Sequence, residues 1–314
     1  MTDIRVERFA DVLVRYSTRI VPGDRVLISA TTAAEPLVKE LYKKVLEQGG
    51  HPQVLMEFPE QNEVLLSLAN DDQLKFKPPF VEYAYENFES RISIMSSMNP
   101  RALSKVDPAR LGARQKALRS ILETQMRRGG TGELKWNTTL FPTLGYAQEA
   151  GMSLAEYEDF VYGACHANQD DPVAYWEKVK QDQDSIVKRV NGHEWFELQG
   201  PNVDLRISTK GRTFVNCCGD KNMPDGEVFT GPVENSASGW VKYTYPAIYN
   251  GVAVEGIELQ FENGKVVKAT AEKNEKFLLE MLDSDPGARY LGEFAIGTNF
   301  ELSLIHISEP TRPE

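Results

Sequence analysis

The sequence is poor in the residues that build disulfide frameworks, membrane spans and nucleic-acid surfaces. Its three cysteines, Cys165 and the adjacent Cys217 and Cys218, are typical of a reducing compartment, and we interpret them as small buried hydrophobic side chains. No run of about 18 apolar residues would cross a bilayer, and the amino terminus lacks the pattern of a signal peptide. The net charge of −11 disfavours an extended phosphate-binding surface. We therefore expect a cytoplasmic protein that binds neither membrane nor nucleic acid.

Three familiar catalytic motifs are also missing. The glycine-rich run 129–132 follows a predicted helix, whereas a phosphate-binding loop joins a strand to a helix. The run 236–239 lacks the glycine that precedes the serine of a nucleophile elbow by two residues. His51, His166 and His193 do not have the spacing of the zinc-binding H-E-x-x-H motif. The sequence supports neither a phosphate loop nor a serine nucleophile nor a helical zinc motif.

The length and the apolar pattern predict two domains of α/β class. A chain of 314 residues exceeds what one core usually holds. Up to about residue 192, strands and helices alternate, which is typical of a mostly parallel sheet flanked by helices. Beyond it, turn signals at 249–251 and 262–264 flank alternating apolar residues and predict β hairpins. We predict an amino-terminal α/β domain over 1–192 and an α+β domain rich in β hairpins over 193–301.

The predicted elements of the first domain can be placed from periodicity and capping signals. Thr32 with Glu35, and Ser153 with Glu156, have the spacing of capping boxes that open helices. Helices are expected over 4–20, from 32 to just before Gly49, over 63–74 and 108–128, and from 153 and 172; strands are expected over 25–28, 53–56, 92–95 and 135–138.

The end of the sequence has a different character. From Leu302 it resembles the in-frame translation of an adapter used to prepare sequencing libraries. We treat residues 302–314 as a non-native tail and exclude them from fold reasoning. The alternative is a natural strand with a proline-terminated tail. His306 is accordingly discounted as a metal ligand.

Two glutamates stand in settings that suit a metal ligand. Glu227 follows a Pro-Asp-Gly turn and begins a short apolar strand, which gives its carboxylate a stiff support. Glu293 is bracketed by apolar and small residues, and an unpaired carboxylate is costly to bury. The alternatives are a surface turn for Glu227 and a structural ion pair for Glu293.

The motifs around these glutamates, over 219–234 and 288–299, with the segment 244–251 between them, resemble the aminopeptidase T family of metallo-aminopeptidases, which also includes aminopeptidase S. The likeness extends to the amino-terminal domain and covers about residues 4–300. The further motifs that carry it lie at 7–10, 22–26, 34–37, 141–143 and 147–153.

The resemblance implies a catalytic metal-binding domain over 193–301 and two divalent ions, which would be zinc, cobalt or manganese. In that family, two glutamates, two histidines, a tyrosine and an aspartate hold the ions, and Glu227 and Glu293 stand in the motifs of the two glutamates. The other four ligands would lie downstream of the break into adapter sequence. The second domain would therefore be incomplete and the fragment inactive. No residue is assigned as general base.

The resemblance also implies an activity and partners. Two metal ions suit the removal of amino-terminal residues from peptides by an activated water, and family members form homodimers. Two alternatives remain open at this point. The amino-terminal domain would hold a small ligand at its strand ends while the acids form ion pairs, or the helices near Leu154 and Val173 would form a dimer surface without catalysis.

Overall fold

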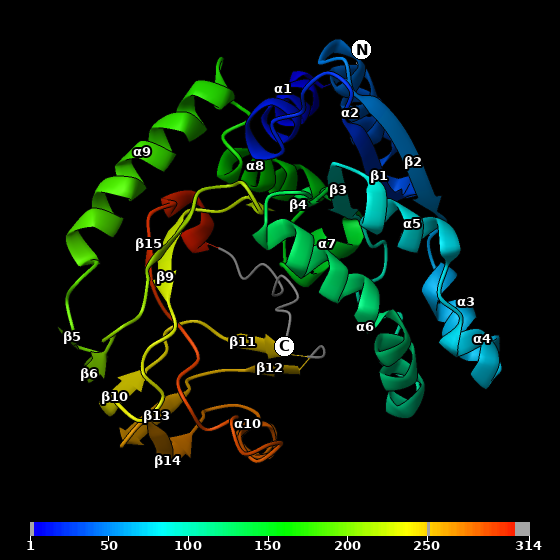
Figure 1. Cartoon of the computed structure of the whole chain (residues 1–314). Coiled ribbons are helices and arrows are strands. Elements are labelled where there is room, and N and C mark those ends of the chain that lie inside the picture. The colour runs from blue at the N-terminus through cyan, green and yellow to red at the C-terminus, as the bar shows by residue number, and fades with distance from the viewer. Residues whose placement is uncertain (1–2, 250–251, 305–314) are drawn as a thin grey trace. The chain divides into compact units, whose positions relative to one another are not determined.

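The computed structural model describes residues 3–249 and 252–304, which form two compact units (Figure 1). Unit 1 contains residues 3–178 and 218–225, and unit 2 contains the described residues of 179–217 and 226–304. The change of unit at Val179 falls inside helix α9, Pro172–Val190. The domain boundary near residue 192 stays a prediction. Among the described residues, no helix has the length and apolarity needed to cross a membrane.

Unit 1 is built on a parallel five-stranded sheet with the order β2-β1-β3-β4-β8. Strand β1, between β2 and β3, places Ile28 opposite Val54 on one side and Ile92 on the other, so apolar residues of neighbouring strands align. The sheet confirms the predicted α/β class. Its strands are β1 Arg25–Thr31, β2 His51–Glu57, β3 Ser90–Met95, β4 Lys135–Leu140 and β8 Asn222–Met223.

Helices cover both faces of this sheet. Helix α2 packs on β1 and β2 and against α1 (Figure 1). Leu27 of β1 packs against Ala84 and Phe88 at the end of α5, and alternation along a strand turns Val26 and Ile28 to the opposite face. The helical elements are α1 Ile4–Asp11, the π-helical turn η1 Val12–Ser17, the 3₁₀ turn η2 Thr32–Ala34, α2 Glu35–Glu47, α3 Gln61–Leu68, α4 Asp71–Lys75, α5 Pro79–Asn87, α6 Pro108–Gly130, α7 Leu144–Glu149 and α8 Leu154–Ala164.

The helix expected over 63–74 is in fact two helices, α3 and α4. Ala69 between them is extended. The Asn70 side chain accepts a hydrogen bond from the Gln73 amide, and the Gln73 side chain accepts one from the Asn70 amide. This capping box starts a new helix where apolar periodicity alone suggested a continuous one.

The two capping boxes predicted from spacing have different outcomes. The box of Ser153 and Glu156 at the start of α8 is confirmed. The box of Thr32 and Glu35 is wrong, because Thr32 already lies in the turn η2 and the side chain of Thr31 accepts from the Ala33 amide instead. The chain thus enters α2 through a 3₁₀ turn, and spacing alone does not distinguish these two starts.

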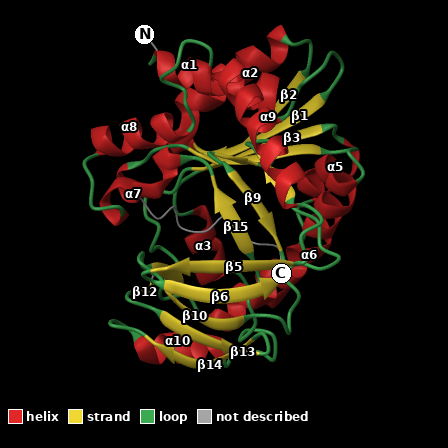
Figure 2. Cartoon of the chain, turned by 90° about the vertical axis from the view of Figure 1, so that its left-hand side faces the viewer, coloured by secondary structure: helices red, strands yellow, loops and turns green. Residues whose placement is uncertain are grey.

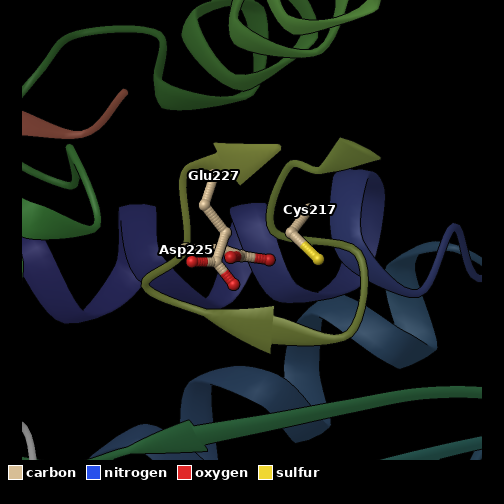
Figure 3. Close-up of side chains that lie close together, drawn as sticks. All are labelled: Cys217, Asp225 and Glu227. Carbon is tan, nitrogen blue, oxygen red and sulfur yellow. The ribbon is translucent and has the colours of Figure 1, made fainter. Parts of the chain in front are cut away.

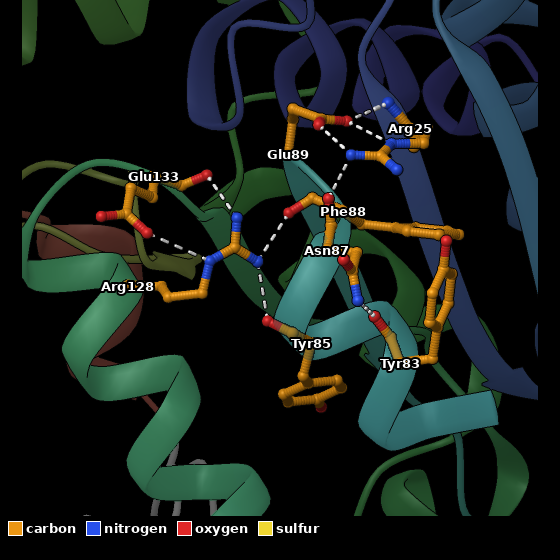
Figure 4. Close-up of polar contacts among 8 residues, drawn as sticks. All are labelled: Arg25, Tyr83, Tyr85, Asn87, Phe88, Glu89, Arg128 and Glu133. Carbon is orange, nitrogen blue, oxygen red and sulfur yellow. Dashed lines mark hydrogen bonds and ion pairs between the residues drawn. The ribbon is translucent and has the colours of Figure 1, made fainter. Parts of the chain in front are cut away.

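A buried arginine connects the carboxyl ends of α5 and α6 (Figure 4). Arg128 is 8% exposed and donates to the carbonyl oxygens of Tyr85 at 2.7 Å, Phe88 at 2.9 Å and Glu133 at 3.2 Å. Its Nε also donates to the Glu133 carboxylate at 3.4 Å. The guanidinium therefore satisfies carbonyls that the end of α5 leaves without helical partners.

Unit 2 consists mainly of antiparallel strands, as predicted for the region after residue 192. A five-stranded sheet has the order β14-β13-β10-β6-β5 (Figure 2), and helix α10 packs on β14. The core of this sheet contains Leu205, Ile207 and Phe261. A second sheet has the order β15-β9-β7, and β11 pairs with β12. The hairpin turn at Asn263 and Gly264 joins β13 to β14 as predicted.

The bounds of the unit 2 elements, in chain order, are β5 Trp195–Gly200, β6 Val203–Ser208, β7 Val215–Cys217, β9 Glu227–Thr230, β10 Ser238–Lys242, β11 Ala247–Tyr249, β12 Val252–Val254, β13 Glu258–Glu262, β14 Lys265–Thr270, α10 Glu275–Leu282, β15 Phe294–Gly297 and the 3₁₀ turn η3 Phe300–Leu304. Positions 250 and 251 of the predicted turn, and residues 305–314 of the predicted tail with His306, lie outside the described residues.

Candidate metal centre

The candidate site lies where strands β7 and β9 meet. Cys217, the last residue of β7, is directly opposite Glu227, the first residue of β9. Opposed residues of an antiparallel pair project their side chains from the same face. The buried side chain of Gln183 in α9 donates to the carbonyls of both Cys217, at 3.0 Å, and Glu227, at 2.7 Å. Gln183 thereby fixes the backbone of both residues.

The chain between these strands is held by side chains of unit 1. Tyr16 donates from its hydroxyl to the Cys218 carbonyl at 2.6 Å. Asn137 and Thr139 of β4 donate to the carbonyls of Gly219 at 3.2 Å and Met223 at 2.7 Å. Burial raises the pKa of the Tyr16 phenol, and the hydrogen bond to Cys218 adds to the increase. Tyr16 therefore stays a protonated donor, and the segment 218–223 is rigidly placed.

Asp225 and Gly226 form the turn that leads into β9. The Asp225 carboxylate accepts a hydrogen bond from the Gly219 amide at 3.0 Å and is buried. Gly226 has a φ of +128°, a conformation that side chains disfavour. Its carbonyl accepts from the Thr298 amide at 2.8 Å. This turn brings the carboxylates of Asp225 and Glu227 close together.

Cys217, Asp225 and Glu227 form a group in which one potential ligand atom of each lies within 4.8 Å of the others (Figure 3). A search of the described residues for three or more histidine, cysteine or acidic side chains within this distance gives this group. Two adjacent carboxylates repel each other unless a proton or a cation lies between them.

The donor set fits a divalent metal ion. Carboxylate oxygen and thiolate sulfur both bind zinc, and three protein ligands with an open position are typical of catalytic zinc. Ligand atoms bound at about 2.1 Å to one tetrahedral ion lie about 3.4 Å apart. The upper bound of 4.8 Å on the spacing of the three ligand atoms is compatible with closure around an ion by side-chain rotation.

Glu293 lies at the other end of the β9/β15 pair. Gly297 is opposite Glu227 and Phe294 is opposite Thr230, so Glu293 extends the ladder to the level of Gly231. The levels of Glu227 and Glu293 are therefore four residues apart along the strands, which corresponds to about 13 Å. The alternation of side chains puts Glu227 and Glu293 on the same face of the pair. Glu293 is partly buried and is not a member of the group of three.

Two members of the group were not assigned as ligands from the sequence. Asp225 lies in the Pro-Asp-Gly turn that precedes Glu227. The sequence signal that could have identified it is its position two residues before a second acidic residue. Cys217 was interpreted as a buried hydrophobic side chain. Cys165 and Cys218 are buried as expected, whereas Cys217 is partly buried. Its place in the group depends on the pairing of β7 with β9, which no local pattern reveals.

The turn at Gly226 supplies a test of this architecture. A Cβ at Gly226 would lie 2.5 Å from Cβ of Asn299. We expect Gly226→Ala to destabilise unit 2 by about 2 kcal/mol, because crowding adds to backbone strain. Gly163→Ala in α8 is the control, since nothing lies within 4 Å of its added Cβ. Urea unfolding followed by tryptophan fluorescence measures both, and an unchanged midpoint for Gly226→Ala contradicts the expectation.

Comparison with known proteins places the chain in a family. Residues 2–308 match the family described as thermophilic metalloprotease (M29). Curated relatives include aminopeptidase AmpS of Bacillus subtilis strain 168, which is 27% identical over 325 residues, and aminopeptidase T of Thermus thermophilus, which is 28% identical over 317 residues. Each match covers 93% of this chain and 76% of the relative.

Solved structures add a likeness of fold. Wild-type AmpT from Thermus thermophilus superposes with a TM-score of 0.83 at 25% identity, covering 97% of this chain and 81% of that chain. The 2,5-dihydroxypyridine dioxygenase of Pseudomonas putida KT2440 reaches a TM-score of 0.53 at 12% identity, covering 93% and 75%. The second likeness concerns the fold alone. Because one fold carries different chemistries, function is inferred from the family match and the site.

Proposed function

The chain belongs to the M29 family of thermophilic metalloproteases, and from this membership we propose that it builds the metal centre of an aminopeptidase that removes amino-terminal residues from peptides. The observation that carries the proposal is the cluster of Cys217, Asp225 and Glu227 in a chain similar to several aminopeptidases. Membership of a metalloprotease family implies metal ions. The aminopeptidases among the relatives imply peptide substrates.

We propose two ions, zinc, cobalt or manganese, with Glu227 and Glu293 as ligands on one face of β9 and β15. The separation of about 13 Å along the ladder suits carboxylates that reach adjacent ions better than carboxylates that share one. Bound ions would polarise the scissile carbonyl and lower the pKa of a water molecule. Asp225 would add a further carboxylate beside Glu227.

Hydrogen bonds among the described residues position the proposed ligands. Gln183 holds the backbones of Cys217 and Glu227 in place, and the Gly219 amide orients the Asp225 carboxylate. The concentrated negative charge attracts a protonated α-amine, which distinguishes a peptide with a free amino terminus from a blocked one. Cytoplasmic location and a homodimer stay predictions.

The proposed ligand set is not complete within the described residues. We propose that two histidines, a tyrosine and an aspartate downstream of Phe300 complete it, as the family resemblance implies. The match covers 76% of each relative's length. The test is a fusion of residues 1–301 with the corresponding downstream segment of aminopeptidase T from Thermus thermophilus. It is expected to release p-nitroaniline from leucine p-nitroanilide until a chelator is added. A folded, zinc-loaded fusion without activity contradicts the proposal.

Zinc binding by the 314-residue chain supplies a second test. We expect Glu227→Gln to weaken zinc binding by about tenfold. Even mutation of a residue that hydrogen-bonds to a metal ligand typically costs 10–100-fold in metal affinity. Glu262→Gln is the matched control, since Glu262 is an exposed residue of β13. Competition with a chromophoric chelator measures both constants. Equal affinities for the two variants would remove Glu227 from the ligand set.

A further inference from the structure

A cavity of about 380 Å³ lies within unit 1, and Cys217, Asp225 and Glu227 are not among its lining residues. It is lined by the carboxyl ends of β1 and β3 and by the segment that follows β2. The chain leaves β1 for β2 on one side and later returns to β3 on the other. Open parallel sheets bind ligands at such a point, in the crevice outside the strand ends. The volume falls in the range of small-molecule sites, about 300–1,000 Å³.

The floor of the cavity consists of small hydroxyl side chains. Ser29 of β1 and Ser93 of β3 approach each other to 3.3 Å between their Oγ atoms. Beside them, Thr31 donates to the Ser96 carbonyl at 2.8 Å, which joins the two strand ends. Tyr146 accepts a hydrogen bond from the Ser97 amide at 3.3 Å and forms part of the wall. These contacts give a preformed polar floor.

The charged residues of the lining are all acidic. Glu57, Glu60 and Glu63 line the cavity, and no lysine, arginine or histidine is among its lining residues. Within the part of the chain that the structure describes, none of the three carboxylates forms an ion pair, although this fold pairs many of its other acids. Burial raises the pKa of the Glu57 carboxyl, and Arg114 opposes this only in part.

The residues that line the cavity limit the class of ligand that it could bind. The three glutamates are not members of a metal-like group among the described residues, so a bare metal ion has no convergent ligand set here. An anion would meet three carboxylates. The wall also has an apolar part, formed by Phe58, Met95, Met98 and Leu103. The cavity therefore offers negative charge, hydroxyl groups and an apolar surface together.

We propose that this cavity binds a small organic cation, a primary ammonium group on a compact apolar body. The ammonium group lies toward Glu57 and the hydroxyls of Ser29 and Ser93, and the body packs on Met95 and Leu103. An ammonium group has three donors and no acceptor, which matches a lining of carboxylate and hydroxyl oxygens. The site is independent of the proposed peptidase chemistry.

The test uses 3-methylbutylamine as the probe, because it carries the ammonium group and a branched apolar body but no scissile bond. Its neutral counterpart, 3-methylbutan-1-ol, has nearly the same shape. Binding to the 314-residue chain is measured by calorimetry in the presence of a chelator, which keeps the metal centre out of the measurement. We expect the alcohol to bind at least about tenfold more weakly, since charge-assisted hydrogen bonds are lost.

Three variants decide between outcomes. Glu57→Gln keeps the shape and is expected to weaken amine binding about tenfold, while Ser93→Val fills the floor and is expected to abolish it. Glu227→Gln is the control and is expected to leave amine binding unchanged. Equal binding of amine and alcohol, or unchanged binding by Glu57→Gln, overturns the proposal. Loss of binding in Glu227→Gln assigns the amine to the metal centre instead and also overturns it.

Discussion

Replacing Glu227 with glutamine in the active fusion is expected to lower kcat/KM for leucine p-nitroanilide by at least about 10²-fold. Changing a residue that only supports a metal ligand typically lowers metal affinity or activity 10–100-fold. Loss of a ligand itself should therefore lower activity by no less. Glu227 is held between Gln183 and the turn at Gly226, and glutamine preserves its size. The loss therefore reports on charge and coordination rather than on packing.

Metal content and activity should fall together. Glu293→Gln is expected to behave like Glu227→Gln, and Glu262→Gln, an exposed change on β13, is expected to keep full activity. The bound zinc per chain is measured on the same samples by elemental analysis. Full activity in either ligand variant excludes that glutamate from the site, and circular dichroism confirms that each variant is folded.

The 314-residue chain by itself is expected to show no turnover with added zinc, cobalt or manganese. Among the described residues, the group of Cys217, Asp225 and Glu227 supplies too few ligands for two ions, and it contains no histidine. Aminopeptidase T of Thermus thermophilus assayed alongside is the positive control. Metal-dependent turnover by the 314-residue chain comparable to that control would contradict the need for downstream ligands.

Replacing Arg128 with methionine is expected to destabilise unit 1 by about 3 kcal/mol. The change removes charge-assisted hydrogen bonds, which contribute roughly 1.5–3 kcal/mol each, and leaves the carbonyls of Tyr85 and Phe88 without their partner. Methionine retains much of the apolar volume, so packing loss is small. For a unit of this size, the midpoint of thermal unfolding should fall by about 6–12 °C.

The adjacent arginine provides a matched control. Arg127 precedes Arg128 in α6 and is less buried, so Arg127→Met removes the same charge from the same helix turn. We expect it to shift the midpoint by less than about 2 °C. Calorimetry measures both variants. Equal shifts would mean that helix charge, rather than the network in Figure 4, stabilises this corner of the sheet.

The parts of the fold that follow from local patterns could be predicted from the sequence. Strand β1 and helix α2 have clear periodicity, and the turn at Asn263 and Gly264 has a recognisable hairpin signal. Helix α5 and the break at Ala69 were not predicted, because the short apolar helices α3 to α5 carry little periodic signal. The strand β8 has two residues and depends on pairing with β4, which no local pattern encodes.

The candidate site was predictable only in part. Glu227 was singled out because a turn and a strand position it, and the structure places it in a group of potential ligands. Cys217 and Asp225 join that group through the β7/β9 register and the bond from Gly219, which are tertiary features. The role of Glu293 as a ligand stays a prediction.

The return of residues 218–225 to unit 1 has a consequence for synthesis on the ribosome. Strand β4 pairs with β8 through Thr139 and Met223, which are 84 positions apart (223 − 139). At about 5–20 residues per second, the edge of β4 waits about 4–17 s for its partner strand. During that interval the nascent sheet presents an unpaired edge, the kind of surface that chaperones shield from other strands. The amino-terminal unit therefore completes its sheet only after part of the second unit has emerged.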